Sequence, residues 1–286
     1  MYLDLYKIDG TINNDTEPCF HNPETYPRFQ EELEEFKNLL IELVYLNEPK
    51  TFYKFGDGDY YFLRKEPVGS ATPGRRALSK GYDQINHEAF VTGAELCDYY
   101  TCEIYPTNRA RFADVISRKV DYPAEFGYGL VTNKWLLETF SGRIGLIGAD
   151  QKMNIIQNLM EAPQYQDYLG LEKFEDYISL PQKFACDDID ATEQMVAEQL
   201  KNSTSKIFLM GMGHVKSGLI HRLKKHANAV FLDVGASIDA LAGIIDVNRP
   251  FAGDWTNYQI DEPHLYEGVD FLAYEGQGKH ITLARE

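Results

Sequence analysis

The chain lacks the features that mark secreted, membrane-spanning and disulfide-stapled proteins. Its longest apolar runs, such as residues 206–210, are far shorter than the roughly 20 residues of a membrane-spanning helix. Residues 1–9 carry acidic side chains within an apolar stretch and have no basic leader, which is not the pattern of a secretory signal. The four cysteines are scattered without a Cys-X-X-Cys pair, which favours reduced thiols. We therefore expect a cytoplasmic protein with no membrane span.

Positive charge is also scarce. The 286 residues include 44 acidic and 28 basic side chains, which gives a formal net charge of −16. Such a surface repels DNA and RNA unless a basic patch is strongly segregated, and Arg75-Arg76 and Lys224-Lys225 are only local pairs. We expect no nucleic-acid partner. A bound diphosphate would need a metal ion or a few well-placed cations to offset the repulsion.

The apolar pattern predicts an α/β fold. Apolar residues recur at helical spacing over residues 28–46, and a strand-like run follows at residues 51–55. Farther along, short apolar strands alternate with helical segments, which is typical of a parallel sheet covered by helices on both faces. These later strands are expected at residues 143–148, 206–213 and 229–233. The pattern predicts a Rossmann-like, mainly parallel sheet.

The two ends of the chain differ from the middle. Residues 1–27 are polar and interrupted by prolines, and they predict an irregular N-terminal arm. Residues 249–286 are aromatic, acidic and punctuated by glycine, and they predict a loop-rich C-terminal extension. No internal repeat is visible, so we expect a single domain over residues 1–286 with its core at about residues 28–248.

An acidic motif interrupts the first strand-like run. Gly56-Asp57-Gly58-Asp59 stands between two apolar runs and places two carboxylates two residues apart. Carboxylate oxygens are the ligands that Mg²⁺ and Mn²⁺ prefer, and a cation held there could neutralise charge on a diphosphate leaving group. The plainer interpretation is a Gly-Asp turn between two strands. We predict Asp57 and Asp59 as metal ligands with a catalytic role, and Gly56 and Gly58 as backbone contacts of the ligand.

Three further turns between an expected strand and helix carry glycine. Glycine lets a phosphate approach the backbone, and a helix start offers unpaired N–H groups. Because the carboxyl ends of parallel strands share one edge, these turns should line a single crevice. The predicted binding residues are Gly148, Asp150, Gly211, Gly213, Lys216, Asp233, Gly235 and Ser237.

Several residues near these turns have open roles. His214 could be a general base, a phosphate ligand or a polar cap, and Asp150, Asp233 and Asp239 are alternative bases. Asp233 could also contact a ribose. We take His214 and Asp239 as the catalytic candidates.

Two arginines stand on a separate loop rich in glycine and proline. Arg75 and Arg76 could clamp a diphosphate because guanidinium matches phosphate bidentately, or they could be solvated.

A dinucleotide-binding fingerprint is the main rival pattern. Gly211-Met-Gly213 follows an expected strand, and Asp233 stands about 20 residues on, as a ribose-binding acid would. However, Lys216 occupies the position where the third glycine is expected. An NAD(P)-linked oxidoreductase built on residues 211–233 therefore remains an alternative.

Three blocks of the chain resemble the GT-D glycosyltransferase group, a bacterial family first described as a domain of unknown function. Lys54-Phe-Gly-Asp-Gly-Asp59 is similar to the group's Arg-Phe-Gly-Asp-Gly-Glu motif. Residues 207–213 resemble its strand and glycine turn, and residues 231–239 resemble its Asp-Ile-Gly block followed by a small residue and an Asp. The resemblance covers about residues 50–245, and the first block is the most specific part.

The resemblance implies a Rossmann-like domain, a nucleotide-sugar donor (commonly a UDP-sugar) and a metal held by an Asp-X-Glu pair. Carried over, it places Asp57 and Asp59 at the cation, although Asp59 departs from the usual Glu and is one methylene shorter. We therefore expect a glycosyltransferase that uses Mn²⁺ or Mg²⁺ and moves a sugar from a UDP-sugar to a hydroxyl of a glycan or glycoprotein. The non-enzymatic alternative is a nucleotide-sugar-binding protein without turnover.

Overall fold

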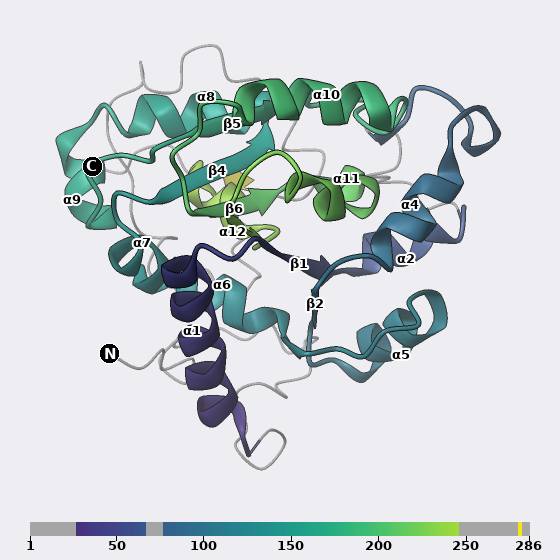
Figure 1. Ribbon diagram of the computed structural model, residues 1–286, viewed down its shortest axis with the longest axis horizontal. Helices are drawn as coiled ribbons and strands as arrows, with labels where there is room; N and C mark the ends of the chain where they lie inside the picture. Colours follow the sequence, from purple (N-terminus) through teal and green to yellow (C-terminus); the bar gives the residue numbers. More distant parts are fainter. Residues whose placement is uncertain (1–26, 67–76, 246–279, 282–286) are drawn as a thin grey trace.

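The computed structural model describes residues 27–66, 77–245 and 280–281. Within them, a seven-stranded sheet has the order β3-β2-β1-β7-β6-β4-β5, and all its pairings are parallel (Figure 1). The strands are β1 (Lys50–Phe55), β2 (Tyr99–Cys102), β3 (Tyr122–Pro123), β4 (Ile144–Ala149), β5 (Tyr177–Leu180), β6 (Ile207–Gly211) and β7 (Val230–Asp233). A separate antiparallel pair joins β8 (Ile244–Ile245) to β9 (His280–Ile281).

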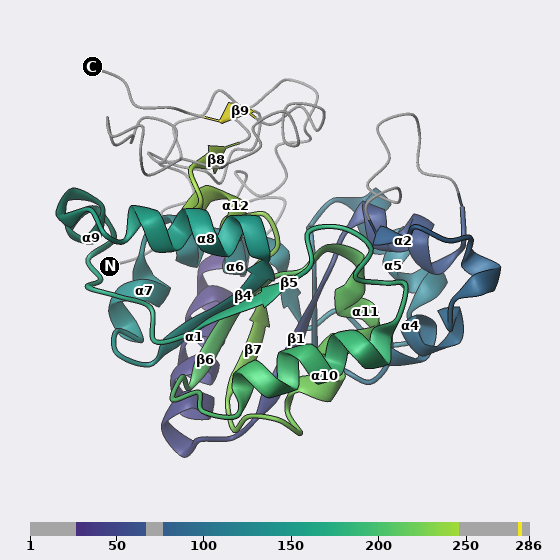
Figure 2. The same cartoon turned by 90° about the horizontal axis from the view of Figure 1, so that it is seen from above.

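Helices cover both faces of this sheet and bury two apolar clusters against it (Figure 2). One face carries α1 (Phe29–Leu46), α6 (Ala124–Thr132), α7 (Trp135–Thr139), α8 (Asp150–Leu159), α9 (Pro163–Leu169) and α12 (Ser237–Leu241). The other face carries α2 (Asp57–Leu63), α4 (His87–Ala94), α5 (Pro106–Val115), α10 (Ile189–Leu200) and α11 (Lys216–Leu223), with short 3-10 turns at η2 (Tyr82–Gln84) and η3 (Gly213–Val215). The predicted Rossmann-like α/β fold is confirmed.

The elements with the clearest apolar pattern form as expected. Helix α1 buries Phe29, Leu33 and Phe36 on one stripe and ends where Asn47 takes a left-handed backbone conformation. Strands β6 and β7 are buried along almost their whole length, as central parallel strands are. Among the described residues, no helix combines the length and apolar character that crossing a bilayer requires.

The apolar run after Asp59 continues as a helix and not as a second strand. Gly56 is extended, and its N–H donates to Asp59 Oδ2 at 2.8 Å, which caps the first turn of α2. Both acids of the motif stand in that turn, where the helix dipole favours negative charge. Phe62 and Leu63 then face the core. The motif therefore opens a helix at the carboxyl end of β1.

The expected N-terminal arm, most of the C-terminal extension, and Arg75 and Arg76 lie outside the described residues. The remaining predicted site residues all lie within them.

Candidate functional site at the carboxyl edge of the sheet

The strand order opens a crevice at the carboxyl edge. β1 and β6 lead into α2 and α11 on one face, whereas β7 and β4 lead into α12 and α8 on the other. Because β1, β7, β6 and β4 are neighbours in that order, helices leave adjacent strands on opposite sides, which is where α/β proteins bind ligands. The acidic motif and all three glycine turns belong to these four strands. The sequence thus identified four adjoining segments of one edge.

Lys216 lies at the centre of this edge and points inward. Its Nζ lies 3.0 Å from Asp59 Oδ2 and 3.0 Å from Asp233 Oδ2, and it also donates to the main-chain oxygen of Lys54. An ammonium group has three N–H donors, and these contacts use all of them. Lys216 is buried and joins β1, α2, β7 and α11, so in this conformation it does not present its charge to a phosphate in the crevice.

Asp59 is the buried counter-ion of Lys216. Burial by itself would raise the pKa of this carboxyl, but the Lys216 ammonium, followed by nearby His214, outweighs burial and lowers the pKa to about 2. His214 Nδ1 is 3.9 Å from Asp59 Oδ1, which is too long for a hydrogen bond, so Lys216 is the principal partner. Asp59 is therefore ionised at neutral pH and already paired.

Asp57 differs from Asp59 in its burial and in its hydrogen-bond partner. Its side chain is exposed, and Oδ1 accepts a 2.8 Å hydrogen bond from the Gly58 N–H. The two carboxylates do not form a ready pair of metal ligands, because an oxygen of Asp59 is bound to Lys216. No cluster of three or more His, Cys, Asp or Glu residues within the described chain could hold a metal ion. Asp57 fits as a single carboxylate ligand, and metal use remains a prediction.

His214 packs against the first turn of α2. A Cβ placed on Gly58 would lie 2.9 Å from His214 Cε1, so the glycine between the two acids makes room for the imidazole. The imidazole also stacks on the Phe62 ring, with 4.9 Å between the ring centroids and an interplanar angle of 5°. Within the described residues, His214 Nδ1 is buried and has no hydrogen-bond partner. The acidic motif thus fixes the position of the histidine.

The glycine turns pack closely against one another. A Cβ on Gly211 would lie 2.8 Å from the Gly235 carbonyl oxygen, so this glycine lets the β6 and β7 turns touch. Gly213 and Gly235 have φ values of +58° and +51°, in the left-handed region that favours glycine. These glycines are therefore explained by packing and backbone conformation, whether or not a phosphate also binds there.

The other predicted acids at this edge are also engaged. Asp239 is buried and ion-paired with Lys152 of the first turn of α8. Asp150 Oδ1 accepts a 2.7 Å hydrogen bond from the Gln151 N–H. Asp233 Oδ1 accepts from the Gly235 N–H at 2.9 Å while Oδ2 holds Lys216, which does not favour a ribose contact. Ser237 is buried at the start of α12.

Sequence reasoning missed a second charged group beside β1. Lys54 Nζ lies 3.6 Å from Oε1 of Glu103, the residue that follows β2. It also lies 5.1 Å from the centre of the Tyr128 ring. Glu125 at the start of α6 is only 2% exposed, and burial together with Glu103 raises its pKa to about 7. Lys54 lies within the quoted motif and could have been found there. Glu103 and Glu125 carry no spacing signal, because the pairing of β1 with β2 brings Glu103 to Lys54 and the interaction of Glu125 is with Glu103.

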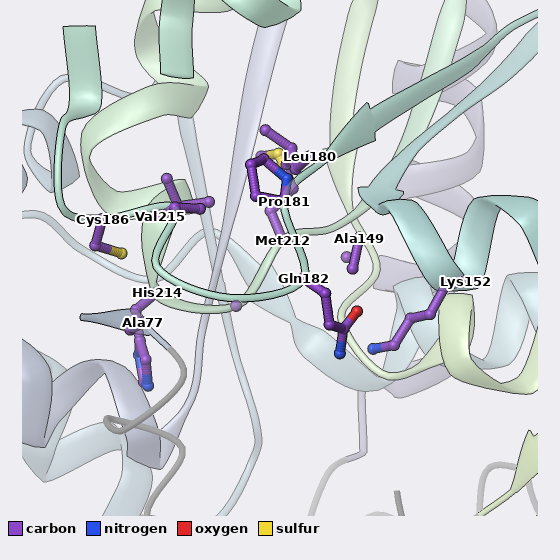
Figure 3. A pocket seen from close by; sticks show the side chains of 13 residues that line it. Ala77, Ala149, Lys152, Leu180, Pro181, Gln182, Cys186, Met212, His214 and Val215 are labelled. Atoms are coloured by element: carbon purple, nitrogen blue, oxygen red, sulfur yellow. The ribbon is translucent and has the colours of Figure 1, made fainter. Parts of the chain in front are cut away.

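A cavity of about 210 Å³ opens over the ends of β4, β5 and β6 (Figure 3). Its polar side chains are Lys152, Gln182 and His214. The remaining wall is largely apolar and comes from the ends of these strands, the loop after β5, the turn after β6 and Ala77, which precedes η2. Gln182 and Lys152 were also missed, since neither belongs to a recognisable motif.

No family model and no curated protein match this chain. A solved structure, "A New Glycosyltransferase (DUF1792) from Streptococcus sanguinis", is similar to it with a TM-score of 0.47 and 13% sequence identity, over 86% of this chain and 97% of that one. That protein is described as a glycosyltransferase, the class of enzyme that the sequence motifs of this chain resemble.

Proposed function

We propose that this chain is a glycosyltransferase that takes its sugar from a nucleoside-diphosphate donor, with a UDP-sugar as the expected donor. The observation that carries the proposal is the meeting of the acidic motif and three glycine turns at one carboxyl edge of the sheet, where the turns after β4 and β6 line a cavity. Helix starts and glycine turns favour phosphate groups, and the motif resembles that of a glycosyltransferase group. The acceptor would be a hydroxyl of a glycan or glycoprotein.

Two lysine side chains at this edge offset part of the negative charge of the chain. Lys152 and Lys54 reach the carboxyl ends of β4 and β1 and pair with Asp239 and Glu103. A diphosphate bound here would share Lys152 with Asp239, which reduces the repulsion expected from a net charge of −16.

Asp57 and His214 are the side chains best placed to meet the reacting groups. Asp59 and Asp239 are already ion-paired, whereas Asp57 is exposed at the start of α2. Asp57 would hold Mn²⁺ or Mg²⁺ together with diphosphate oxygens and water, and such an ion neutralises charge on the leaving diphosphate. His214 lines the cavity, and Nε2, the ring nitrogen other than the buried Nδ1, would accept the proton of the acceptor hydroxyl.

The deciding experiment measures donor turnover by the full chain. A panel of nucleotide sugars is incubated with Mn²⁺, with Mg²⁺ or with excess EDTA, and release of the nucleoside diphosphate is followed. We expect turnover of at least one donor, strongest with a divalent ion, and a loss of about 100-fold or more in His214→Gln without a fall in Tm. Full activity in EDTA would rule out a metal requirement. Full activity in His214→Gln would rule out His214 as the base.

Two other functions make different predictions in the same assays. An oxidoreductase would bind NADH and need Asp233 for the ribose, but this carboxylate is occupied by Lys216 and the Gly235 N–H. A nucleotide-sugar-binding protein would bind UDP without donor hydrolysis or transfer. Turnover of a nucleotide sugar without NADH binding therefore separates the proposal from both.

A further inference from the structure

We propose that the cavity beside Gln182 is the subsite for the nucleobase of the nucleotide donor, an assignment that rests on the proposed function. Its volume of about 210 Å³ is below the roughly 300–1,000 Å³ of sites that enclose a whole drug-sized ligand. The cavity therefore takes one portion of a nucleotide sugar. The nature of its walls and one unpartnered polar atom indicate which portion.

The walls favour a flat ring over a sugar or a phosphate. Leu180 and Pro181 come from the end of β5, and Met212 and Val215 come from the turn after β6. Sugar hydroxyls and phosphate oxygens would lose water against such walls without gaining hydrogen bonds, which costs free energy. A heterocyclic ring presents apolar faces to them and confines its polar atoms to its edge.

Gln182 supplies a partner for that edge. Its Oε1 is buried and has no hydrogen-bond partner in the described part of the chain, and buried polar atoms of this kind are uncommon in folded proteins. A side-chain amide offers an acceptor next to a donor, and it can turn by 180° to exchange them. The edge of a nucleobase offers an N–H next to a carbonyl or ring nitrogen, which is the complementary pair.

Lys152 connects this subsite to the phosphates. Its side chain extends from the first turn of α8 toward Gln182, and both line the cavity (Figure 3). In a nucleoside diphosphate, the ribose alone separates the base from the first phosphate. A cation near the amide, at a helix start, is thus suitably placed for the phosphate of the same nucleotide.

The test measures binding of UDP and of inorganic pyrophosphate to the full chain by isothermal titration calorimetry. In Gln182→Leu, UDP affinity should fall about tenfold, the effect of one lost hydrogen bond, while pyrophosphate affinity is unchanged. Its Tm should be equal or higher, because the substitution removes an unpartnered polar atom. Ala185→Phe, which fills the cavity from the loop after β5, should abolish the part of UDP affinity that exceeds pyrophosphate affinity.

Gln166→Leu is the matched control. The Gln166 amide donates to the Met160 carbonyl oxygen at 2.6 Å and does not line the cavity. This variant should lower Tm and leave UDP affinity unchanged, which is the opposite pattern to Gln182→Leu.

Each result has a definite meaning. Equal UDP affinity in the wild type and both cavity variants, or no UDP binding by the wild type, overturns the nucleobase subsite. A parallel loss of pyrophosphate affinity in Gln182→Leu also overturns it, since the amide would then act on the phosphates. UDP binding that depends on Gln182, combined with no turnover of any nucleotide sugar, leaves the subsite standing and overturns the proposed transferase.

Discussion

Asp57 and Asp59 are separated by one glycine, yet they occupy opposite physical environments. Asp59 is buried and bound to Lys216, whereas Asp57 is exposed and, within the described part of the chain, accepts a hydrogen bond from the Gly58 N–H of its own turn. An Asp-X-Asp spacing at a helix start turns successive carboxylates to different sides, which a strand-end interpretation does not anticipate. Sequence could identify the pair, but burial decides which member meets a ligand.

The two acids should therefore respond differently to amidation. Asp59→Asn removes one of the two carboxylates that compensate a buried ammonium, so the free energy of unfolding should fall by about 3 kcal/mol. Asp57→Asn changes an exposed side chain and should stay within about 0.5 kcal/mol of the wild type, while sugar transfer is lost. Urea denaturation and donor turnover measure the two effects. Equal destabilisation by both substitutions would contradict this division.

Gly58 offers a second test at a single atom. Alanine is favoured over glycine inside a helix by about 1 kcal/mol, but a methyl group here would lie 2.9 Å from His214 Cε1. We expect Gly58→Ala to displace the imidazole, so that turnover falls at least tenfold while Tm changes by only a few degrees. The NMR signal of the His214 Cε1–H group should shift as well. An unchanged signal with full activity would show that the histidine position is not set by this glycine.

Secondary structure elements could be predicted where the apolar residues follow one regular spacing along the sequence. The helix at residues 28–46 and the strands around residues 143–148, 206–213 and 229–233 form close to their expected positions. The helix has one apolar face and is buried on that face, whereas the strands are largely apolar and are buried on both faces. Helix α2 could not be predicted, because a hydrogen bond between Asp59 and the Gly56 N–H, and the ion pair with Lys216, favour a helix start there. The resemblance identified the motif but carried no information about its conformation.

The inward-pointing Lys216 links four elements, and this link can be measured. Lys216→Met leaves Asp59 and Asp233 buried near each other without their cation, which should lower the free energy of unfolding by about 3–5 kcal/mol. Adding Asp59→Asn removes one of the two stranded charges, so the double variant should be less destabilised than the sum of the single variants. A double-mutant cycle by urea denaturation gives this coupling. Strict additivity would mean that the two groups do not interact.

At the scale of the whole molecule, lysine side chains at the carboxyl edge of the sheet are paired with carboxylates of this acidic chain. Lys54, Lys152 and Lys216 come from β1, α8 and α11, and each contacts at least one carboxylate. These partners lie far apart in sequence, so no local pattern could reveal them. The parallel sheet brings them together because it gathers all its carboxyl ends on one side.

Glu125 should make the stability of the whole protein depend on pH. The pKa of its buried carboxyl is raised from 4.5 to about 7, by burial and then by Glu103, so the folded protein holds a proton that the unfolded chain releases. Its contribution is therefore complete below about pH 4.5 and is lost as the pH rises toward 7, a change of up to about 3 kcal/mol. Glu125→Gln mimics the protonated form, so its free energy of unfolding should fall less than that of the wild type between pH 5 and pH 8. Urea denaturation at both pH values measures this difference, and parallel changes in the two proteins would show that Glu125 is already ionised in the folded state at pH 5.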